Sequence, residues 1–221
     1  MSLLVVKVGG AVAGASATAV VELAATNDVC VVHGAGPQIS ADMERAGIPV
    51  EFVGGRRVTS TDAVTIVRAS FAAVNEALCL AIGERAVGLF GDEIGLAARV
   101  VPELGCVGDP LPSSPSAVVA ALAEGLIPVV APIAVGPLNV NADEAAAALA
   151  LGLGAERLLF LTDVDGLILD GRVVDEIDVD AAAKLLDGGT LQGGIIPKLG
   201  AAVTAARGGV PASIGRTAVP A

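Results

Sequence analysis

Short runs of β-branched and other aliphatic residues alternate along this chain with alanine-rich stretches, and this alternation restricts the fold more than any other feature. The apolar runs are mostly continuous, which is typical of strands that are buried on both faces. They predict strands at Leu3–Val8, Val29–His33, Ala86–Phe90, Ile127–Ala131 and Arg157–Thr162. The stretches between them predict helices at Ala17–Ala25, Ile39–Ala46, Thr61–Ile82, Ser116–Glu124, Ala142–Leu151 and Ala181–Leu186.

A repeated strand, helix, strand order implies parallel pairing with right-handed crossovers. We therefore expect an α/β protein, a three-layer αβα sandwich with a mainly parallel central sheet, formed as a single domain over residues 1–221. Asp170-Gly171 lies between apolar β-branched flanks and predicts one local hairpin late in the chain. If the domain divides into two lobes, the boundary falls in the turn-rich stretch around Gly136–Asn139.

The composition is 54% hydrophobic but only 2% aromatic, so the core must be packed from Ala, Val, Leu and Ile. Three widely separated cysteines without C-x-x-C spacing argue against a disulfide framework or a zinc site. The first residues do not have the pattern of a signal peptide, and the longest apolar runs are interrupted by Gly, Pro or charge. We expect a cytoplasmic protein that does not associate with membranes.

The formal net charge is −11 and the pI is about 4.4, so the overall field repels nucleic acid and anionic membrane surfaces. No nucleic-acid partner is expected. The same field repels an anionic substrate, so a site for one must create local positive potential from a few of the 13 basic residues and from backbone N–H groups.

Three glycine-rich turns are candidates for such a site: Lys7–Ala11, His33–Gln38 and Gln192–Lys198. Glycine at the carboxyl end of a parallel strand lets backbone N–H groups approach a ligand, and a following helix favours an anion there. None of the turns matches the P-loop or the dinucleotide-binding fingerprint. Lys7, inside a buried strand, needs an anionic partner, unless its stem lines the core and its amine reaches solvent.

Seven segments in this order resemble the amino acid kinase family, most closely its N-acetylglutamate kinase branch: "KVGG", "VVHGAGPQI", "GGRRVTS", "IPVVAPI", "LNVNADEAA", "LLFLTDVDGLI" and "GGIIPKLGAA". The resemblance covers Leu3 to about Ala206. It implies the carbamate kinase-like fold of that family and transfer of the γ-phosphoryl group of ATP to a carboxylate. The implied acceptor is N-acetyl-L-glutamate, in arginine biosynthesis. Mg²⁺ would be carried by the ATP phosphates, with no metal ligands from the protein.

The resemblance also implies a phosphoryl-transfer site. Lys7 and Lys198 would contact the phosphates, and Asp143 would hold both lysines by accepting hydrogen bonds from them. On the nucleotide side it implies Gly9, Gly10, Thr162 and Asp163. By position alone, Asp143 could equally stabilise the N-terminus of the helix that follows it, and Asp163 could cap a turn.

For the acceptor, the resemblance implies Gly34, Ala35, Gly36, Arg57 and Asn139. Arg57 would grip the second carboxylate of the substrate, with its neighbour Arg56 as a rival for that role. Asn141 could shape the turn instead of binding substrate. The single histidine, His33, would contribute to the architecture of its loop rather than to the chemistry.

The family pattern further implies a homodimer, with an acceptor-binding lobe at about residues 1–137 and a nucleotide-binding lobe at about 138–221. This chain departs from the pattern at Ala35, where relatives have a glycine, so a methyl group would intrude on the substrate loop. The stretch Ala11–Thr26 is short, which would trim the substrate lid, and the sequence stops at "SIGRTAVPA", which would weaken packing around adenine. Two alternatives stay open: a kinase of a related carboxylate, such as carrier-linked aminoadipate or glutamate, and a weakened family member that only binds ligand.

Overall fold

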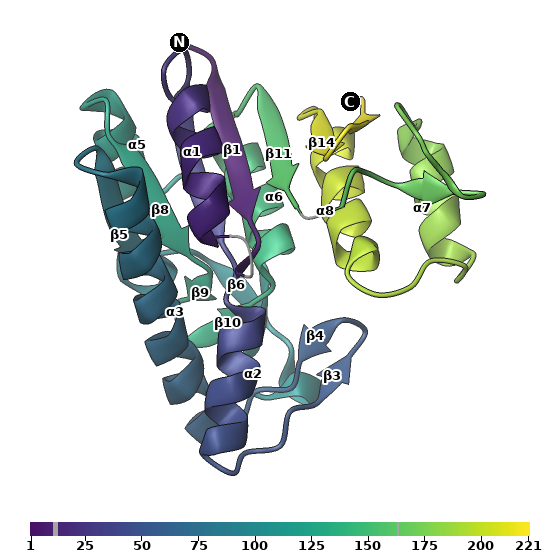
Figure 1. The fold of residues 1–221 in the computed structure, drawn as a ribbon. Helices are drawn as coiled ribbons and strands as arrows, with labels where there is room; N and C mark the ends of the chain where they lie inside the picture. The colour runs from purple at the N-terminus through teal and green to yellow at the C-terminus, as the bar shows by residue number, and fades with distance from the viewer. Residues whose placement is uncertain (11–12, 163) are drawn as a thin grey trace.

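A seven-stranded sheet forms the centre of the computed structural model, which describes residues 1–10, 13–162 and 164–221 (Figure 1). Its strand order is β15-β14-β11-β1-β2-β8-β5, and every neighbouring pair is parallel except β14 with β15. The strands are β1 (Leu3–Val8), β2 (Asp28–His33), β5 (Ala86–Phe90), β8 (Ile127–Ala131), β11 (Arg157–Leu161), β14 (Ala212–Ile214) and β15 (Thr217–Val219). The expected α/β fold with a mainly parallel sheet is confirmed.

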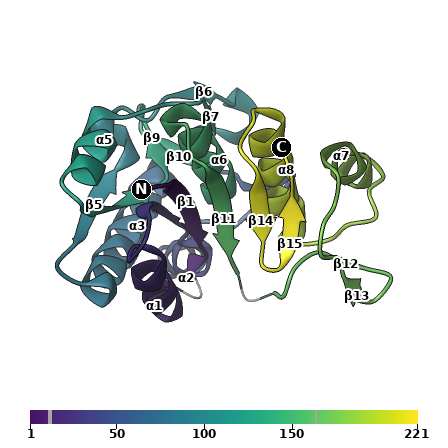
Figure 2. The ribbon, with the colours of Figure 1, turned by 90° about the horizontal axis from the view of Figure 1, so that it is seen from above.

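Helices cover both faces of this sheet (Figure 2). One face carries α1 (Ala13–Leu23) and α3 (Thr61–Ile82), and the other carries α5 (Ser116–Ala123), α6 (Ala142–Leu153) and α8 (Ile195–Arg207). Side chains alternate between the two layers along each strand, so that Val5 packs in the α6 layer and Val6 in the α1 layer. Lys7 comes two residues after Val5 and therefore faces α6.

The longest helix, α3, shows why this sequence folds locally as it does. Ser60 caps its start by accepting a hydrogen bond from the backbone N–H of Ala63, and Gly83 ends it with a φ of 101°. Its buried residues recur at helical spacing against α1, α2 (Gly36–Arg45), β5 and β8. In the described part of the chain, α3 alone is long and apolar enough to cross a membrane, a test that core helices of soluble proteins also pass.

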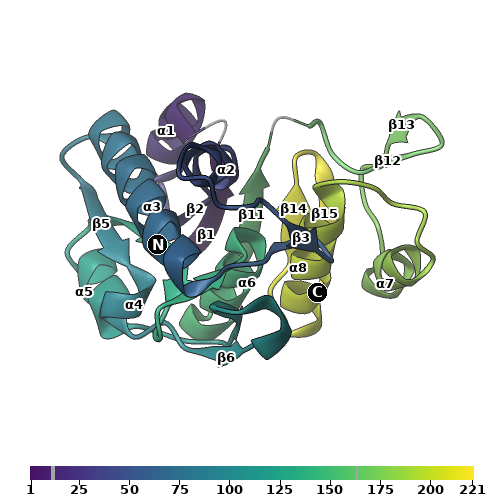
Figure 3. The same cartoon turned by 90° about the horizontal axis from the view of Figure 1, so that it is seen from below.

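Smaller elements surround the sheet. A second, four-stranded sheet has the order β6-β7-β10-β9, and two hairpins pair β3 with β4 and β12 with β13. Their bounds are β3 (Phe52–Val53), β4 (Arg56–Arg57), β6 (Ala98–Val100), β7 (Val107–Pro110), β9 (Ile133–Ala134), β10 (Leu138–Val140), β12 (Ile168–Leu169) and β13 (Arg172–Val173). The short helices are α4 (Gly91–Ile94), the 3-10 turn η2 (Pro102–Leu104) and α7 (Val179–Asp187). Helix α7 and the β12–β13 hairpin lie beyond α8, at one end of the molecule (Figure 3).

The hairpin predicted at Asp170-Gly171 is confirmed, since both residues have positive φ, 49° and 75°, as a tight turn between twisted strands requires. Other predictions were displaced or incomplete. The first two helices begin earlier than expected, at Ala13 and at Gly36, and the strand after Ala155 ends at Leu161. Apart from that hairpin, the strands of two to four residues were not predicted, because so few residues show no periodicity, and α8 was not predicted because it starts without a side-chain cap.

Candidate active site

A cavity of about 440 Å³ opens at the carboxyl ends of the central parallel strands. Its walls come from the glycine turns after β1 and β2, from β4 and β10, and from the first turns of α6 and α8. Among the residues that line it are Lys7, Gly9, Gly10, Gly34, Ala35, Gly36, Arg57, Asn139, Asp143, Thr162 and Lys198. These are all of the predicted site residues except Asp163, which lies outside the described residues.

Lys7, Asp143 and Lys198 form a buried charge cluster in this cavity. Lys7 and Asp143 are 6% and 5% exposed, and Lys7 Nζ lies 2.8 Å from Asp143 Oδ1. Lys198 Nζ lies 3.8 Å from Asp143 Oδ2 and 3.5 Å from the carbonyl oxygen of Gly194. The expected hydrogen bond from Lys198 to Asp143 is not present, because 3.8 Å is too long, whereas Lys7 lies within hydrogen-bonding distance of Asp143 Oδ1. The contacts are ion pairs.

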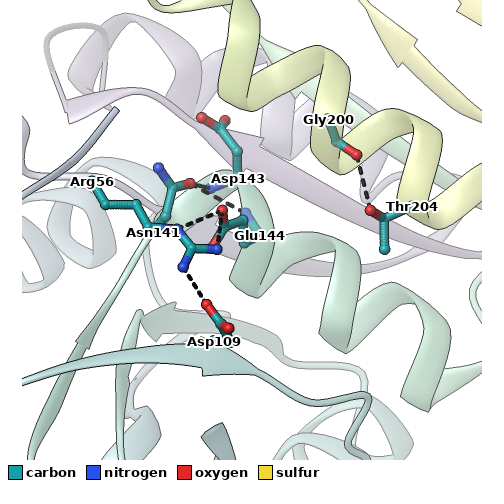
Figure 4. Close-up of polar contacts among 7 residues, drawn as sticks. All are labelled: Arg56, Asp109, Asn141, Asp143, Glu144, Gly200 and Thr204. Atoms are coloured by element: carbon teal, nitrogen blue, oxygen red, sulfur yellow. Dashed lines mark hydrogen bonds and ion pairs between the residues drawn. The ribbon is translucent and has the colours of Figure 1, made fainter. Parts of the chain in front are cut away.

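Asn141 fixes the position of Asp143 at the start of α6. Its side-chain oxygen accepts hydrogen bonds from the backbone N–H groups of Asp143, at 2.8 Å, and Glu144, at 3.3 Å, and so caps the helix. The suggestion that Asn141 shapes the turn is confirmed. Figure 4 shows the Asp143 carboxylate pointing away from Glu144. Of the two carboxylates in the first turn of α6, Asp143 thus faces the lysines and Glu144 faces Arg56.

The adjacent arginines of β4 differ in their partners. Arg56 donates to Glu144 Oε1 from Nε at 3.1 Å and from Nη2 at 2.9 Å, and it also pairs with Asp109 (Figure 4). Burial alone would lower the pKa of Arg56, but Glu144 and Asp109 outweigh it and raise that pKa. Burial also raises the pKa of Glu144, against the opposing effect of Arg56. The charge of Arg56 is thus already balanced by carboxylates.

Arg57 has no carboxylate partner within the described part of the chain, although it is only 6% exposed. Its Nη2 donates to the carbonyl oxygen of Gly36 at 3.0 Å and to Ser40 Oγ at 2.8 Å, and its guanidinium lies 4.6 Å from the ring centre of Phe52. Burial lowers its pKa. A buried cation held in place by neutral groups keeps its charge available for an anion, which favours Arg57 over Arg56 as the carboxylate grip.

The described charges of the cavity are unbalanced in favour of cations. Lys7, Lys198 and Arg57 line the cavity with one carboxylate, Asp143. Arg56 also lines it and pairs with Glu144 and Asp109. With Arg56 counted beside Glu144 and Asp109, the four described cations stand against three carboxylates, an excess of one positive charge in a protein of formal net charge −11. Among the described residues of this site, cations therefore outnumber carboxylates, as an anionic substrate requires.

The two glycine turns pack against each other through their backbones. The backbone N–H of Gly34 donates to the carbonyl oxygen of Val8, and Gln38 Nε2 donates to that of Gly10. A Cβ at position 10 would lie 2.7 Å from the Gly34 carbonyl oxygen, so only glycine fits there. Helix α2 begins beside this contact without a side-chain cap, which leaves its first N–H groups directed outward from the helix.

The methyl group of Ala35 obstructs the site less than expected. Ala35 is 1% exposed and belongs to the hydrophobic cluster that also contains Ile39 and Met43. The expected intrusion on the substrate loop is thus limited, because Ala35 is buried in this cluster although it also lines the cavity.

Asn139 and Thr59 form a polar contact that sequence reasoning missed in part. Asn139 Nδ2 donates to Thr59 Oγ1 at 3.0 Å, and Thr59 donates to the carbonyl oxygen of Arg57 at 3.0 Å. These two hydrogen bonds connect β10 to β4. They use the amide nitrogen of Asn139, so its side-chain oxygen remains for other contacts. Thr59 lies inside the segment "GGRRVTS", but nothing in its residue type singled it out. Ser40 was missed for the same reason.

A larger cavity, of about 720 Å³, lies between α6, α8, β7 and the segment that contains Val101, Glu103 and Leu104. Its walls are mainly aliphatic, and it shares Arg56 and Asn141 with the smaller cavity. Lys7, Asp143 and Lys198 do not line it. Of these two cavities, the smaller one is therefore the one lined by the ion pairs among Lys7, Asp143 and Lys198.

Comparison with known proteins places the chain in a family. The model of the amino acid kinase family matches residues 2–216. An acetylglutamate kinase of Rubrobacter xylanophilus is 42% identical over 97% of this chain and 88% of its own length, and one from Nocardioides is 45% identical over 82% of this chain and 64% of its own. The crystal structure of smu.665 from Streptococcus mutans has a TM-score of 0.86 at 28% identity, covering 99% of this chain and 98% of that one. This chain belongs to the amino acid kinase family.

Proposed function

We propose that this protein transfers the γ-phosphoryl group of ATP to the side-chain carboxylate of N-acetyl-L-glutamate, as a step of arginine biosynthesis. One carboxylate oxygen attacks the γ-phosphorus, the bond to the β,γ-bridging oxygen breaks, and the products are N-acetylglutamyl 5-phosphate and ADP. The buried cluster of Lys7, Asp143 and Lys198 between two glycine turns is the observation that carries this proposal. The acetylglutamate kinases that resemble this chain support the choice of acceptor.

The reaction brings two anions together, so neutralisation of charge and alignment are its main requirements. In our proposal, Lys7 contacts the transferring phosphoryl oxygens and Lys198 contacts them from the nucleotide side. The backbone N–H groups at Gly9 and Gly10 hold phosphate oxygens as their negative charge increases. Asp143 keeps both ammonium groups oriented, at 2.8 and 3.8 Å, without cancelling their combined charge.

The acceptor would bind over the loop Gly34–Gly36, with its second carboxylate on Arg57 and its acetamido group near Asn139. A planar guanidinium with two parallel N–H donors matches a carboxylate, and the lack of a protein carboxylate beside Arg57 leaves it suited to that role. A carboxylate is already ionised at neutral pH, so the nucleophile needs no general base. His33 is fully buried and does not line the cavity.

The nucleotide would bind over the segment 138–221, beside Thr162 and Asp163, and the acceptor over the segment 1–137. The described residues contain no group of three or more His, Cys, Asp or Glu side chains that could hold a metal ion. We propose that Mg²⁺ arrives with ATP, where it neutralises phosphate charge. The chain itself contributes Lys7, Lys198 and the glycine N–H groups to the same task.

We also expect a homodimer, in the cytoplasm. Strand β5 forms an edge of the central sheet, and α3 beside it exposes Leu80 to 76%. An unpaired sheet edge next to an apolar helix surface suits association with a second copy. Light scattering on the eluting protein would measure a mass of twice 21.6 kDa, whereas the mass of a single chain would contradict the expectation.

The acceptor can be identified by trapping the acyl phosphate with hydroxylamine while ADP release is measured. The panel consists of N-acetylglutamate, N-acetylaspartate, glutamate, aspartate, carbamate and UMP, each with Mg-ATP. Hydroxamate formed selectively from N-acetylglutamate is the expected result. No product from any of them, in a protein that still binds ATP, would contradict the proposal and favour a carrier-linked acceptor or binding without turnover.

A further inference from the structure

His33 is buried directly behind the acceptor loop Gly34–Gly36 and takes no part in the proposed chemistry. It ends β2, is 0% exposed, and makes two polar contacts through its ring. Nε2 lies 3.0 Å from Asn75 Nδ2, and Nδ1 lies 3.4 Å from the carbonyl oxygen of Gly34. The edge of the ring meets Phe71, with a centroid distance of 5.9 Å and an interplanar angle of 73°.

The surroundings of Asn75 decide which ring nitrogen carries the proton. Asn75 Nδ2 also lies 2.8 Å from the carbonyl oxygen of Val129, which can only accept a hydrogen bond. Nδ2 is therefore the amide nitrogen, because an amide oxygen would face that carbonyl acceptor to acceptor. Its second hydrogen points at His33 Nε2, which must then be the unprotonated nitrogen. The neutral ring thus has its hydrogen on Nδ1, facing Gly34.

The contacts on the other side of the amide agree with this orientation. A Cβ at Gly88 would lie 2.2 Å from Asn75 Oδ1, and Cys79 Sγ lies 3.7 Å from the same oxygen, within reach of a weak S–H hydrogen bond. The ring also stays neutral in the ordinary pH range, because burial lowers the pKa of His33 to about 4.

The Gly34 carbonyl is held from two sides. The Nδ1–H of His33 faces it on one side, and Gly10 packs against it so closely that a Cβ there would lie 2.7 Å away. In a trans peptide, the carbonyl of one residue and the N–H of the next point in opposite directions. The orientation of the Gly34 carbonyl consequently sets the direction of the Ala35 N–H, one of the loop donors proposed for the acceptor.

We propose that His33 and Asn75 form a positioning pair for phosphoryl transfer: Asn75 fixes the imidazole as its Nδ1–H tautomer, and that N–H fixes the Gly34 carbonyl and with it the acceptor loop. This inference rests on the proposed function, because it assigns the pair a role in placing the acceptor. It predicts that disturbing the pair impairs use of N-acetylglutamate more than binding of ATP.

The first test is nuclear magnetic resonance of untagged protein labelled with ¹⁵N-histidine, which is unambiguous because the chain contains one histidine. Long-range proton–nitrogen spectra report which ring nitrogen is protonated. The expected result at pH 7 is the Nδ1–H tautomer in the wild type and a population of the Nε2–H tautomer in Asn75→Ala. Either an Nε2–H tautomer in the wild type or an unchanged ring in Asn75→Ala would overturn the pair.

The second test separates the two contacts by substitution. Counted in bonds from Cβ, the amide nitrogen of an Asn matches Nδ1, and the amide oxygen of a Gln matches Nε2. His33→Asn thus keeps a donor toward Gly34, whereas His33→Gln keeps only an acceptor toward Asn75. We expect His33→Asn to retain kcat/KM for N-acetylglutamate within about tenfold of the wild type and His33→Gln to lose about a hundredfold, with unchanged ATP affinity in both.

Melting temperatures of both variants, measured beside the kinetics, show whether each is folded at the assay temperature. Equal kcat/KM in two folded variants, or a better Gln variant, would overturn the positioning role. Failure of the proposed function looks different, because the wild type itself would then be inactive with N-acetylglutamate. In that case the tautomer measurement alone supports or overturns the pair.

Discussion

Replacing Asp143 by Asn tests the central ion pair with almost no change of shape. Lys7 and Asp143 have side chains that are each 7% exposed, so water screens their 2.8 Å contact very little. The Coulomb term of Asp143 toward Lys7 exceeds that toward Lys198, at 3.8 Å, by a factor of about 1.4, because it varies inversely with distance. The substitution therefore acts mainly through Lys7. Removing one partner of a buried pair leaves an uncompensated charge and costs roughly 3–5 kcal/mol of stability.

For a chain of 221 residues, at about 2–4 °C per kcal/mol, this loss corresponds to a fall in melting temperature of roughly 6–20 °C. Scanning calorimetry measures it directly. A non-hydrolysable ATP analogue should raise the melting temperature of Asp143→Asn more than that of the wild type, because its phosphates supply the missing negative charge. Turnover should fall by orders of magnitude. The matched control is Asp180→Asn, which removes an exposed ion pair to Arg207 and should leave melting close to the wild type. Asp143→Asn with the melting temperature and turnover of the wild type would refute this reasoning.

Three further changes have defined outcomes. Arg57→Lys should raise KM for N-acetylglutamate about tenfold or more and leave KM for ATP unchanged, because one ammonium cannot replace two parallel N–H donors; steady-state kinetics with each substrate varied will check this. Gly10→Ala should lower the free energy of unfolding in urea by roughly 1–3 kcal/mol, since its Cβ would lie 2.7 Å from a backbone oxygen. In the control Gly200→Ala, the new Cβ would have no atom within 4 Å, so the protein should not be destabilised. The third concerns pH: His33 has a folded pKa of about 4, below its ordinary 6.5, so the unfolded chain binds the proton more readily. The contribution of neutral His33 to the free energy of unfolding is then complete above pH 6.5 and decreases by about 3 kcal/mol as the pH falls toward 4. Urea unfolding of the wild type across this pH range should show that decrease, and His33→Asn should not.

The elements that the sequence predicted best are those with both a periodic pattern and a chemical boundary. Helix α3 was predicted at its observed bounds, Thr61–Ile82, because its buried residues recur at helical spacing between Ser60 and Gly83. Helix α8 lacked both signals: Gly194 precedes it without a side-chain cap and Pro197 lies in its first turn. The short strands of the second sheet are set by tertiary pairing rather than by local sequence.

The composition of the site was more predictable than its geometry. The ordered motifs identified the residues that line the cavity, but neighbours of the same type could not be ranked from sequence. Arg56 and Arg57 are adjacent on β4, and side chains alternate along a strand, so only the folded structure shows that Glu144 and Asp109 balance one of them.

The central claim, that Lys7 stabilises the phosphoryl group during its transfer, is tested most directly by single-turnover transfer from γ-³²P-ATP to N-acetylglutamate. Wild type, Lys7→Met and Lys184→Met should be compared at saturating substrates; Lys184 is an exposed lysine of α7 and serves as the matched control. We predict labelled acyl phosphate from the wild type and from Lys184→Met at equal rates, and a rate lower by about a hundredfold or more for Lys7→Met. Transfer by Lys7→Met at the rate of the control would contradict the claim.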